Sequence, residues 1–240
     1  MSKNTANKTQ SEKLFMSDVR QKITFSIIES YKNIRTNVLS LMAKKNAKTL
    51  AITSPNASEG KSTTALNLAI TISQLGKKVL IIDADAHKPS LHRKLKIDNK
   101  IGLLEVLSST ATLSEATHAH NEFLDVITCN TLTPNPSELL SSEKFDELFN
   151  EFKEKYDYII LDTPPVNPVA DALVLAQKVD LLIMVVRASS TTYDAFKKSV
   201  KALKVLDLNV DGVIINGADP RPKGYYKSKY SYYKSNNYYY

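Results

Sequence analysis

The sequence predicts an α/β fold with a doubly wound, mostly parallel sheet and helices on both of its faces. Three observations predict it. Short apolar runs rich in β-branched residues alternate with helical patterns along the chain. A segment that ends in Gly-Lys-Ser-Thr, Thr53–Thr63, separates the first such run from a helix. Two later runs, Val79–Asp85 and Tyr156–Asp162, end in aspartate, as expected where parallel strands deliver side chains to a ligand site.

The predicted elements begin near residue 25. Apolar side chains recur at helical spacing over Phe25–Lys45, which predicts an amphipathic helix. A strand is expected at Thr49–Thr53, followed by a helix at Thr63–Leu75 with Gly76 as its C-cap. Further strands are predicted at Val79–Asp85, Phe123–Cys129, Tyr156–Asp162, Asp180–Val186 and Gly212–Gly217. Further helices are predicted at Ser137–Lys155, Asp171–Gln177 and Tyr193–Leu206.

Composition is typical of a globular protein. The chain has 240 residues, of which 42% are hydrophobic and 24% charged, enough for one large domain with its own core. We expect that domain at residues 25–218, after a flexible N-terminal arm at 1–24 and before a tail at 219–240. No apolar run is long enough to cross a bilayer, and no secretory signal is found. The single cysteine, Cys129, is predicted to be a small core residue in a reducing compartment.

The last twenty residues have a biased composition. They carry five cations and no acid, so most of the net charge of +7 belongs to the tail and not to a basic face of the domain. This argues against nucleic-acid binding. The tail has no aliphatic side chain to anchor a core, so we expect it to be disordered. It holds eight of the chain's 12 tyrosines: Tyr225, Tyr226, Tyr230, Tyr232, Tyr233, Tyr238, Tyr239 and Tyr240.

A phosphate-binding loop is predicted between the first strand and the following helix, which makes the fold one of the P-loop NTPase type. Backbone N–H groups of such a loop cradle the phosphates of ATP. Lys61 is expected to reach the β- and γ-phosphates and the Ser62 hydroxyl to bind Mg²⁺. The loop departs from the general pattern, since Pro55 stands five residues before Gly60, where glycine is usual. The predicted nucleotide contacts are Ser58, Glu59, Gly60, Lys61, Ser62 and Thr63.

Two acidic motifs are expected at the same edge of the sheet. Asp83 and Asp85 end one strand, and Asp162 ends another. A carboxylate in this position holds Mg²⁺ directly or through water, and a second one accepts a hydroxyl proton. A turn-forming or helix-capping role is the weaker alternative for Asp83 and Asp162, and it weighs equally for Asp85. The basic residues that follow are expected either to touch phosphate or to form a solvated turn: His87, Lys88 and Arg93.

These motifs resemble the bacterial tyrosine kinase family, specifically its free-standing form, the CpsD/CapB-like proteins of Gram-positive polysaccharide clusters. The resemblance covers about residues 25–240. It is carried by Ser54–Thr63 as Walker A, by Val79–Pro89 as the family's Walker A′, and by Ile159–Pro165 as Walker B. The segment Asn135–Ser142 and the terminal tyrosine cluster complete the resemblance.

The resemblance implies a protein-tyrosine autokinase that uses ATP and Mg²⁺. It implies that Asp83 is the general base and acts with Lys61 and Asp85 as the catalytic residues. The implied Mg²⁺ ligands are Ser62, Asp85 and Asp162. Asn216, which ends the last strand, would contact adenine, and the tail tyrosines would accept phosphate.

The resemblance also implies partners. These are a transmembrane polysaccharide co-polymerase that activates the kinase, a cognate phosphotyrosine phosphatase, and identical subunits in a ring, an octamer, in which one tail reaches the neighbouring site. The chain would be cytoplasmic, held at the inner face of the membrane by its activator, and would regulate capsular or exopolysaccharide synthesis. The ring contacts would be Glu29, Lys32 and Arg35, in a stretch where the family has Glu-x-x-Arg-x-x-Arg.

Two departures from the family pattern affect these expectations. Lys32 keeps the charge of the motif's first arginine but loses the bidentate fork, which weakens the case for the ring. In the phosphate loop, Ala57-Ser58 replaces the usual Pro-Gly. Serine adopts a positive φ less readily than glycine, so the loop geometry is expected to change slightly while ATP binding is retained.

Two other functions fit the same motifs. One is a partitioning or cell-division ATPase of the ParA/MinD type, but that family carries an extra lysine early in its P-loop, where this chain has Asn56. The other is a non-enzymatic, nucleotide-dependent scaffold whose aromatic and basic tail binds polymer or nucleic acid. Phosphotyrosine formation would favour the kinase, whereas weak ATPase activity with DNA binding would favour the first alternative.

Overall fold

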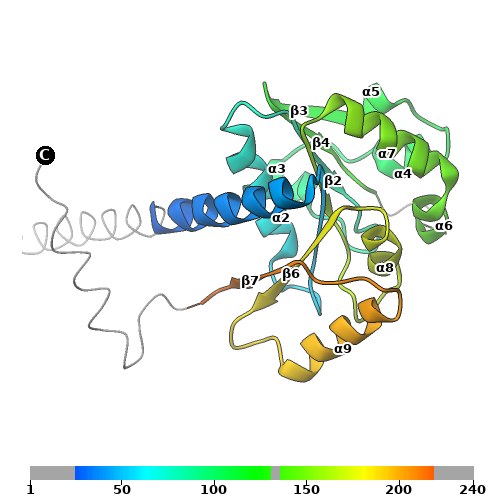
Figure 1. Cartoon of the computed structure of the whole chain (residues 1–240). Coiled ribbons are helices and arrows are strands. Elements are labelled where there is room, and N and C mark those ends of the chain that lie inside the picture. Colours follow the sequence, from blue (N-terminus) through cyan, green and yellow to red (C-terminus); the bar gives the residue numbers. More distant parts are fainter. Residues whose placement is uncertain (1–24, 131–135, 219–240) are drawn as a thin grey trace, which may run out of the picture.

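The computed structural model describes residues 25–130 and 136–218, which contain one seven-stranded sheet (Figure 1). The strand order is β3-β4-β2-β5-β1-β6-β7. All neighbouring strands pair in parallel except β3, which is antiparallel to β4. The predicted arm and tail, 1–24 and 219–240, lie outside the described residues. The strands are β1 (Thr49–Thr53), β2 (Val79–Asp83), β3 (Thr117–Asn121), β4 (Leu124–Ile127), β5 (Tyr158–Asp162), β6 (Leu181–Arg187) and β7 (Gly212–Asn216).

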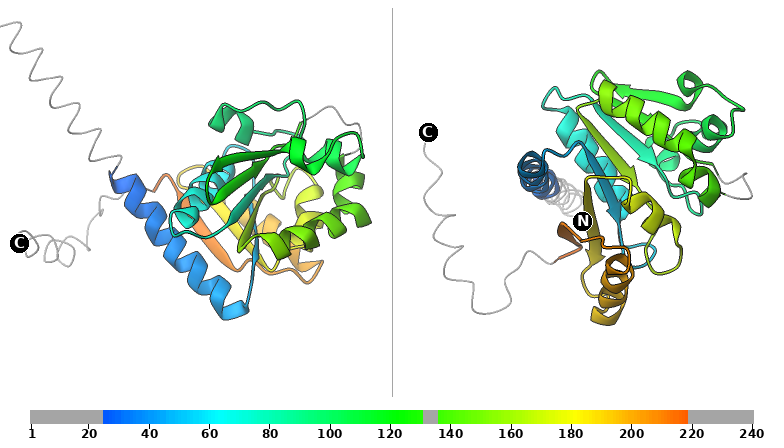
Figure 2. Two further views of the ribbon diagram at one scale, coloured as in Figure 1. Left: turned by 90° about the horizontal axis from the view of Figure 1, so that it is seen from above. Right: turned by 45° about the vertical axis from the view of Figure 1, so that its right-hand side comes forward.

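Helices cover both faces of the sheet, which confirms the predicted fold class (Figure 2). On one face, a helix over residues 25–45, here called the N-terminal helix, packs with α2 over a core that contains Leu50 and Ile81. On the other face, α4, α7 and α8 cover Leu80 and Ile159. The labelled helices are α2 (Lys61–Ser73), α3 (Leu91–Leu95), α4 (Leu103–Leu107), α5 (Leu113–Ala116), α6 (Pro136–Ser141), α7 (Glu143–Lys155), α8 (Asp171–Ala176) and α9 (Tyr193–Lys204).

Every predicted strand is present, but one predicted helix is wrong. The stretch Ser137–Lys155 forms two helices, α6 and α7, because Ser142 adopts an extended conformation (φ −71°, ψ 154°) between them. Its hydroxyl accepts a hydrogen bond from the Phe145 N–H and so caps α7. The strand β3 and the short helices α3, α4 and α5 were not predicted. The strand β3 has the sequence THAHN and is largely exposed, so it lacks the apolar run that marks the other strands.

Aspartates occupy the amino end of the sheet. The Asp180 Oδ2 atom accepts hydrogen bonds from the N–H groups of Lys48 and Thr49, each at 2.9 Å, and from the Thr49 hydroxyl at 2.8 Å. Partial burial raises the pKa of Asp180, but these hydrogen bonds bring it below its ordinary value. Asp157 and Asp211 accept from backbone N–H groups next to β2 and in β6 in the same way. These carboxylates satisfy donors that the parallel ladders leave unpaired.

Candidate active site

The phosphate loop lies between β1 and α2, and its shape depends on one glycine. Gly60 has a φ of +99°, and a β-carbon at this position would lie 2.1 Å from the Asn216 Nδ2 atom. Ser58 has a φ of +66°, so serine adopts the left-handed conformation that glycine adopts at lower cost. Ser58 is therefore a strained residue in this loop, and the expected change of loop geometry stays a prediction.

Glu59 holds this loop against the connection between β6 and α9. Its side chain is buried, and Oε1 accepts a hydrogen bond from the Thr191 hydroxyl at 2.6 Å. Oε2 accepts one from the Asn56 N–H at 3.1 Å. The Glu59 carbonyl accepts a third from Asn216 Nδ2 at 3.0 Å. Glu59 was predicted to contact nucleotide, but its carboxylate faces the protein, so the backbone is the part of this residue that remains for a phosphate.

Lys61, at the start of α2, lies among carboxylates. Its Nζ atom is 2.7 Å from Asp85 Oδ2 and 3.4 Å from both Asp162 Oδ1 and Ser62 Oγ. Burial lowers the pKa of Lys61, but the charges of Asp162 and Asp85 raise it above its ordinary value. The lysine is therefore a buried cation that joins the phosphate loop to both acidic motifs at one edge of the sheet, and its predicted contact with the phosphates stays a prediction.

Asp83 is the most enclosed of the predicted catalytic residues. Its Oδ2 atom accepts hydrogen bonds from the N–H groups of Ser90 at 2.8 Å and Leu91 at 3.0 Å, at the start of α3. Its Oδ1 atom accepts one from the Asp85 N–H at 3.2 Å. Burial, followed by the charge of Asp162, raises the pKa of Asp83 to about 7. The carboxylate thus has the helix-capping contacts of the weaker alternative, and its role as a general base stays a prediction.

Asp162 fits a Mg²⁺ site. Its Oδ2 atom is buried and makes no hydrogen bond. Burial raises the pKa of the Asp162 carboxyl above its ordinary value, although the charge of Lys61 and a hydrogen bond from Ser62 act in the opposite direction. A carboxylate oxygen without a partner beside a serine hydroxyl suits a hard cation. Within the described part of the chain, no three His, Cys, Asp or Glu side chains could hold a metal by themselves. Mg²⁺ would therefore take further ligands from nucleotide phosphates, as it commonly does.

The phosphate loop, Asp85 and Asn216 line one pocket of about 620 Å³. Of the other predicted site residues, Ser58, Gly60, Lys61, Ser62 and Thr63 also line it, whereas Glu59, Asp83 and Asp162 do not. Cations outnumber carboxylates among the described lining residues, since Asp85 is the one carboxylate. The cations are Lys61, Lys88, Arg93, Lys94 and Arg187. This excess of positive charge suits a polyanion such as a nucleoside triphosphate.

Two of these cations were not predicted. The Arg187 guanidinium donates a hydrogen bond to the Ser58 carbonyl at 3.3 Å, and the Lys94 ammonium donates one to the Thr63 hydroxyl at 2.9 Å. Arg187 is the last residue of β6, so its place at the carboxyl end of a strand was a signal that could have identified it. Lys94 belongs to α3, which the sequence analysis missed.

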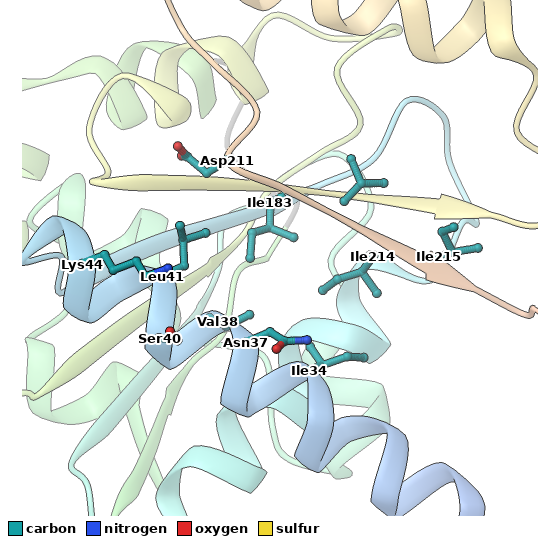
Figure 3. A pocket seen from close by; sticks show the side chains of 12 residues that line it. Ile34, Asn37, Val38, Ser40, Leu41, Lys44, Ile183, Asp211, Ile214 and Ile215 are labelled. Atoms are coloured by element: carbon teal, nitrogen blue, oxygen red, sulfur yellow. The ribbon is translucent and has the colours of Figure 1, made fainter. Parts of the chain in front are cut away.

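A second pocket, of about 510 Å³, lies between the N-terminal helix and β7 (Figure 3). Ile34, Leu41 and Ile214 line it, and none of the predicted nucleotide-site residues does. Along this helix, Arg35 donates a hydrogen bond to the Thr71 carbonyl of α2 at 2.8 Å, and Lys32 pairs with Glu29 at 2.8 Å. Arg35 therefore binds within its own chain, whereas Lys32 is exposed and Glu29 is half-buried. Among the described helices, none combines the length and the apolar character that a bilayer span requires.

Comparison with known proteins gives consistent matches. A family model described as an AAA domain matches residues 47–210. The tyrosine-protein kinase YwqD of Bacillus subtilis (strain 168) is 40% identical over 205 residues, which are 84% of this chain and 86% of that protein. The putative tyrosine-protein kinase CapB of Staphylococcus aureus is 37% identical over 199 residues, 82% of this chain and 87% of that protein. The solved kinase domain of the Escherichia coli tyrosine kinase ETK superposes with a TM-score of 0.77 at 32% identity, covering 83% of this chain and 78% of that domain.

Proposed function

The chain belongs to the family of bacterial tyrosine-protein kinases, and from this we propose that it transfers the γ-phosphate of ATP to tyrosine side chains. The observation that carries the proposal is the position of Lys61. Its ammonium lies within the phosphate-loop pocket, between the carboxylates of Asp85 and Asp162. Such a lysine neutralises transferring phosphate, and the flanking carboxylates suit Mg²⁺ and proton transfer.

We assign the roles from accessibility. Ser62 and Asp162 would hold Mg²⁺, which would supply positive charge at the phosphates, and Asp85, the third implied ligand, is assigned to proton transfer instead. Asp85 lines the pocket and contacts Lys61, so it is the carboxylate best placed to take the phenolic proton once Lys61 turns to phosphate. In the transfer itself, the phenolic oxygen bonds to the γ-phosphorus while the bond from that phosphorus to the β,γ-bridging oxygen breaks and ADP leaves. This proposal departs from the resemblance, which implies Asp83 as the general base. Asp83 does not line the pocket, and its hydrogen bonds fix the start of α3.

We further propose that the acceptors are the chain's own tail tyrosines. Eight tyrosines in a segment of twenty residues support this, as does a pocket rich in cations that would retain a phosphorylated product. The proposed partners are those that the resemblance implies: a transmembrane activator of a polysaccharide export or synthesis system, a phosphotyrosine phosphatase, and identical subunits. The chain would then act at the inner face of the membrane.

Two variants test the proposal. We expect the full chain to form phosphotyrosine with MgATP, and a chain that ends after Pro220 to lose most of the signal. Lys61→Met should abolish it by removing the cation at the phosphates. Because this change also leaves Asp85 and Asp162 buried without their cation, Ser62→Ala is a necessary companion, since it removes a hydroxyl proposed to bind Mg²⁺ and keeps Lys61 in place. A strong signal after Lys61→Met, with folding verified by thermal melting, would refute the catalytic assignment, and a signal after truncation would refute the tail as main acceptor.

A further inference from the structure

The strand order shows which end of the nucleotide pocket would hold the γ-phosphate. The phosphate loop follows β1, which lies between β5 and β6. The Lys61 ammonium lies against Asp85, after β2, and against Asp162, in β5. Since the lysine of a P-loop reaches the β- and γ-phosphates, the γ-phosphate end of the pocket is on the β2–β5 side. In-line transfer requires the acceptor to enter from that side.

The β2–β5 side of the pocket has an apolar part and a polar part. The loop between β5 and α8 contributes the apolar side chains, Pro164, Pro165, Pro168 and Val169, whereas the segment after β2 contributes His87 together with the charged and polar residues Asp85, Lys88, Ser90, Arg93 and Lys94. His87 and Pro168 are exposed and Val169 is partly buried, so all three can contact a ligand. We call His87, Pro168 and Val169 the acceptor wall. Proline and valine offer aliphatic surface to an aromatic ring, and histidine adds a single hydrogen-bonding group.

Hydrogen bonds fix this wall relative to the phosphate loop. The Val166 N–H donates to the Ser54 carbonyl at 2.9 Å, and the Asn167 N–H donates to the Pro55 carbonyl at 3.2 Å. The Thr53 hydroxyl donates to the Pro164 carbonyl at 2.7 Å. The loop that carries Pro168 and Val169 is thus tied to the loop that would hold the phosphates, so the spacing between nucleotide and wall is set before any ligand arrives.

Asp171 joins the two halves of the wall. It is 3% exposed and lies 2.9 Å, through Oδ2, from the Nε2 atom of His87. Its Oδ1 atom accepts a hydrogen bond from the Ser137 hydroxyl in α6 at 2.5 Å. Because Asp171 begins α8, directly after the loop that carries Val169, it holds His87 beside that loop. With Nε2 turned toward Asp171, Nδ1 is the ring nitrogen that remains for a ligand.

We propose that the acceptor wall binds the phenol ring of the tyrosine that receives the phosphoryl group. Pro168 and Val169 contact the ring, and His87 forms a hydrogen bond with the phenolic oxygen. Asp171 is a positioning residue that acts through His87. The inference rests on the proposed function and deepens it, since it assigns the second substrate to a defined part of the pocket and explains why an apolar surface borders a cationic phosphate site.

The test separates acceptor binding from nucleotide binding. The full-length chain is given MgATP and a synthetic peptide with the sequence of residues 223–234, and phosphopeptide is quantified by mass spectrometry. We expect the Pro168→Ala/Val169→Ala double variant to raise the apparent KM for the peptide by about three- to tenfold, with the KM for MgATP changed less than about twofold. Val205→Ala is the matched control, because Val205 is 82% exposed at the end of α9 and outside the pocket.

Asp171 is tested with a double-mutant cycle. His87→Ala and Asp171→Ala should each raise the peptide KM, and the double variant should be no worse than His87→Ala alone, because Asp171 acts through His87. Additive effects would refute the positioning role. Unchanged peptide KM in the wall variants, or an equal rise in the KM for MgATP, would refute the acceptor wall. Failure of the proposed function is seen separately, as a wild-type chain that phosphorylates neither peptide nor tail.

Discussion

At the scale of single residues, the site places two carboxylates side by side. Asp83 of β2 and Asp162 of β5 are register partners, and burial is the main cause that raises the pKa of each. For Asp83 the pKa is raised to about 7, so in the free protein this carboxyl is partly protonated at neutral pH. A bound cation favours the ionised form, and its binding must therefore release protons.

This coupling predicts a pH-dependent affinity. We expect the Kd for Mg²⁺–ADP to fall as the pH rises from 6 to 8 and to level off above the Asp83 pKa of about 7. Calorimetry in two buffers with different ionisation enthalpies measures both the affinity and the protons released. Asp83→Asn should flatten the profile, whereas a wild-type affinity independent of pH would contradict the coupling.

The raised pKa of Asp83 also affects stability. Between about pH 4 and pH 7 the folded protein keeps a proton on Asp83 that the unfolded chain has lost, so the contribution of Asp83 to the free energy of unfolding should fall as the pH rises through this range.

The sequence showed which residues lie at the ends of the strands, but it did not show where their side chains point. Lys61, Ser62, Asp85 and Asn216 line one pocket as predicted, because parallel strands bring their carboxyl ends to one edge. The directions of the Glu59 and Asp83 side chains depend on distant partners, Thr191 and the start of α3. No local pattern encodes those contacts, and the same holds for the pair formed by His87 and Asp171.

At the scale of elements, one arginine adds a polar contact between the N-terminal helix and α2. Arg35 donates a hydrogen bond to the Thr71 carbonyl, near the end of α2. The last turn of α2 contains no basic residue of its own. A cation at a helix C-terminus is favourable because the last carbonyls lack partners. Arg35 was predicted as a ring contact. The structure assigns it an intrachain contact first, and its place at a subunit interface remains a prediction.

We therefore expect Arg35→Met to destabilise the docking of the N-terminal helix. Loss of a hydrogen bond from a charged donor should lower the free energy of unfolding by about 1–2 kcal/mol. Urea unfolding measures this change, and hydrogen exchange should report faster exchange in residues 25–45. Lys32→Met is the matched control, since its exposed pair with Glu29 is expected to contribute less than about 0.5 kcal/mol. Equal losses for both variants would contradict the anchoring role.

Element prediction worked where apolar periodicity was strong. The buried central strands are continuous apolar runs, and their existence followed directly from that pattern. The break between α6 and α7 was missed, because Ser142 was assigned to the interior of a long amphipathic stretch instead of to an N-cap. The helices α3, α4 and α5 have four or five residues, too few for a periodic signal.

At the scale of the whole molecule, the exposed part of the N-terminal helix is suited to assembly. Phe25 and Ile27 are 67% and 50% exposed, and Glu29 and Lys32 follow on the same helix with exposed charges. Surface of this kind, apolar side chains beside polar ones, is typical of protein–protein contacts. It supports the proposed ring, in which the tail of one subunit reaches the site of another.

The proposed ring would make activity depend on assembly. We expect Glu29→Arg to lower the mass measured by light scattering and, at the same protein concentration, to remove most of the tail phosphotyrosine, because the tail then lacks a neighbouring site. The control is Glu147→Arg, a charge reversal at an exposed position of α7, which should change neither quantity. Wild-type phosphotyrosine in a fully monomeric Glu29→Arg chain would argue for phosphorylation within one subunit.

The aspartates at the amino end of the sheet have a consequence for the loops at the opposite edge. Asp157, Asp180 and Asp211 bind backbone donors at the edge opposite the pocket, and none of them lines the nucleotide site. Contacts that hold the strands in place are therefore separated in space from loops that meet substrates. Substitutions in the loops proposed to face the acceptor would therefore leave the hydrogen bonds of these three aspartates intact.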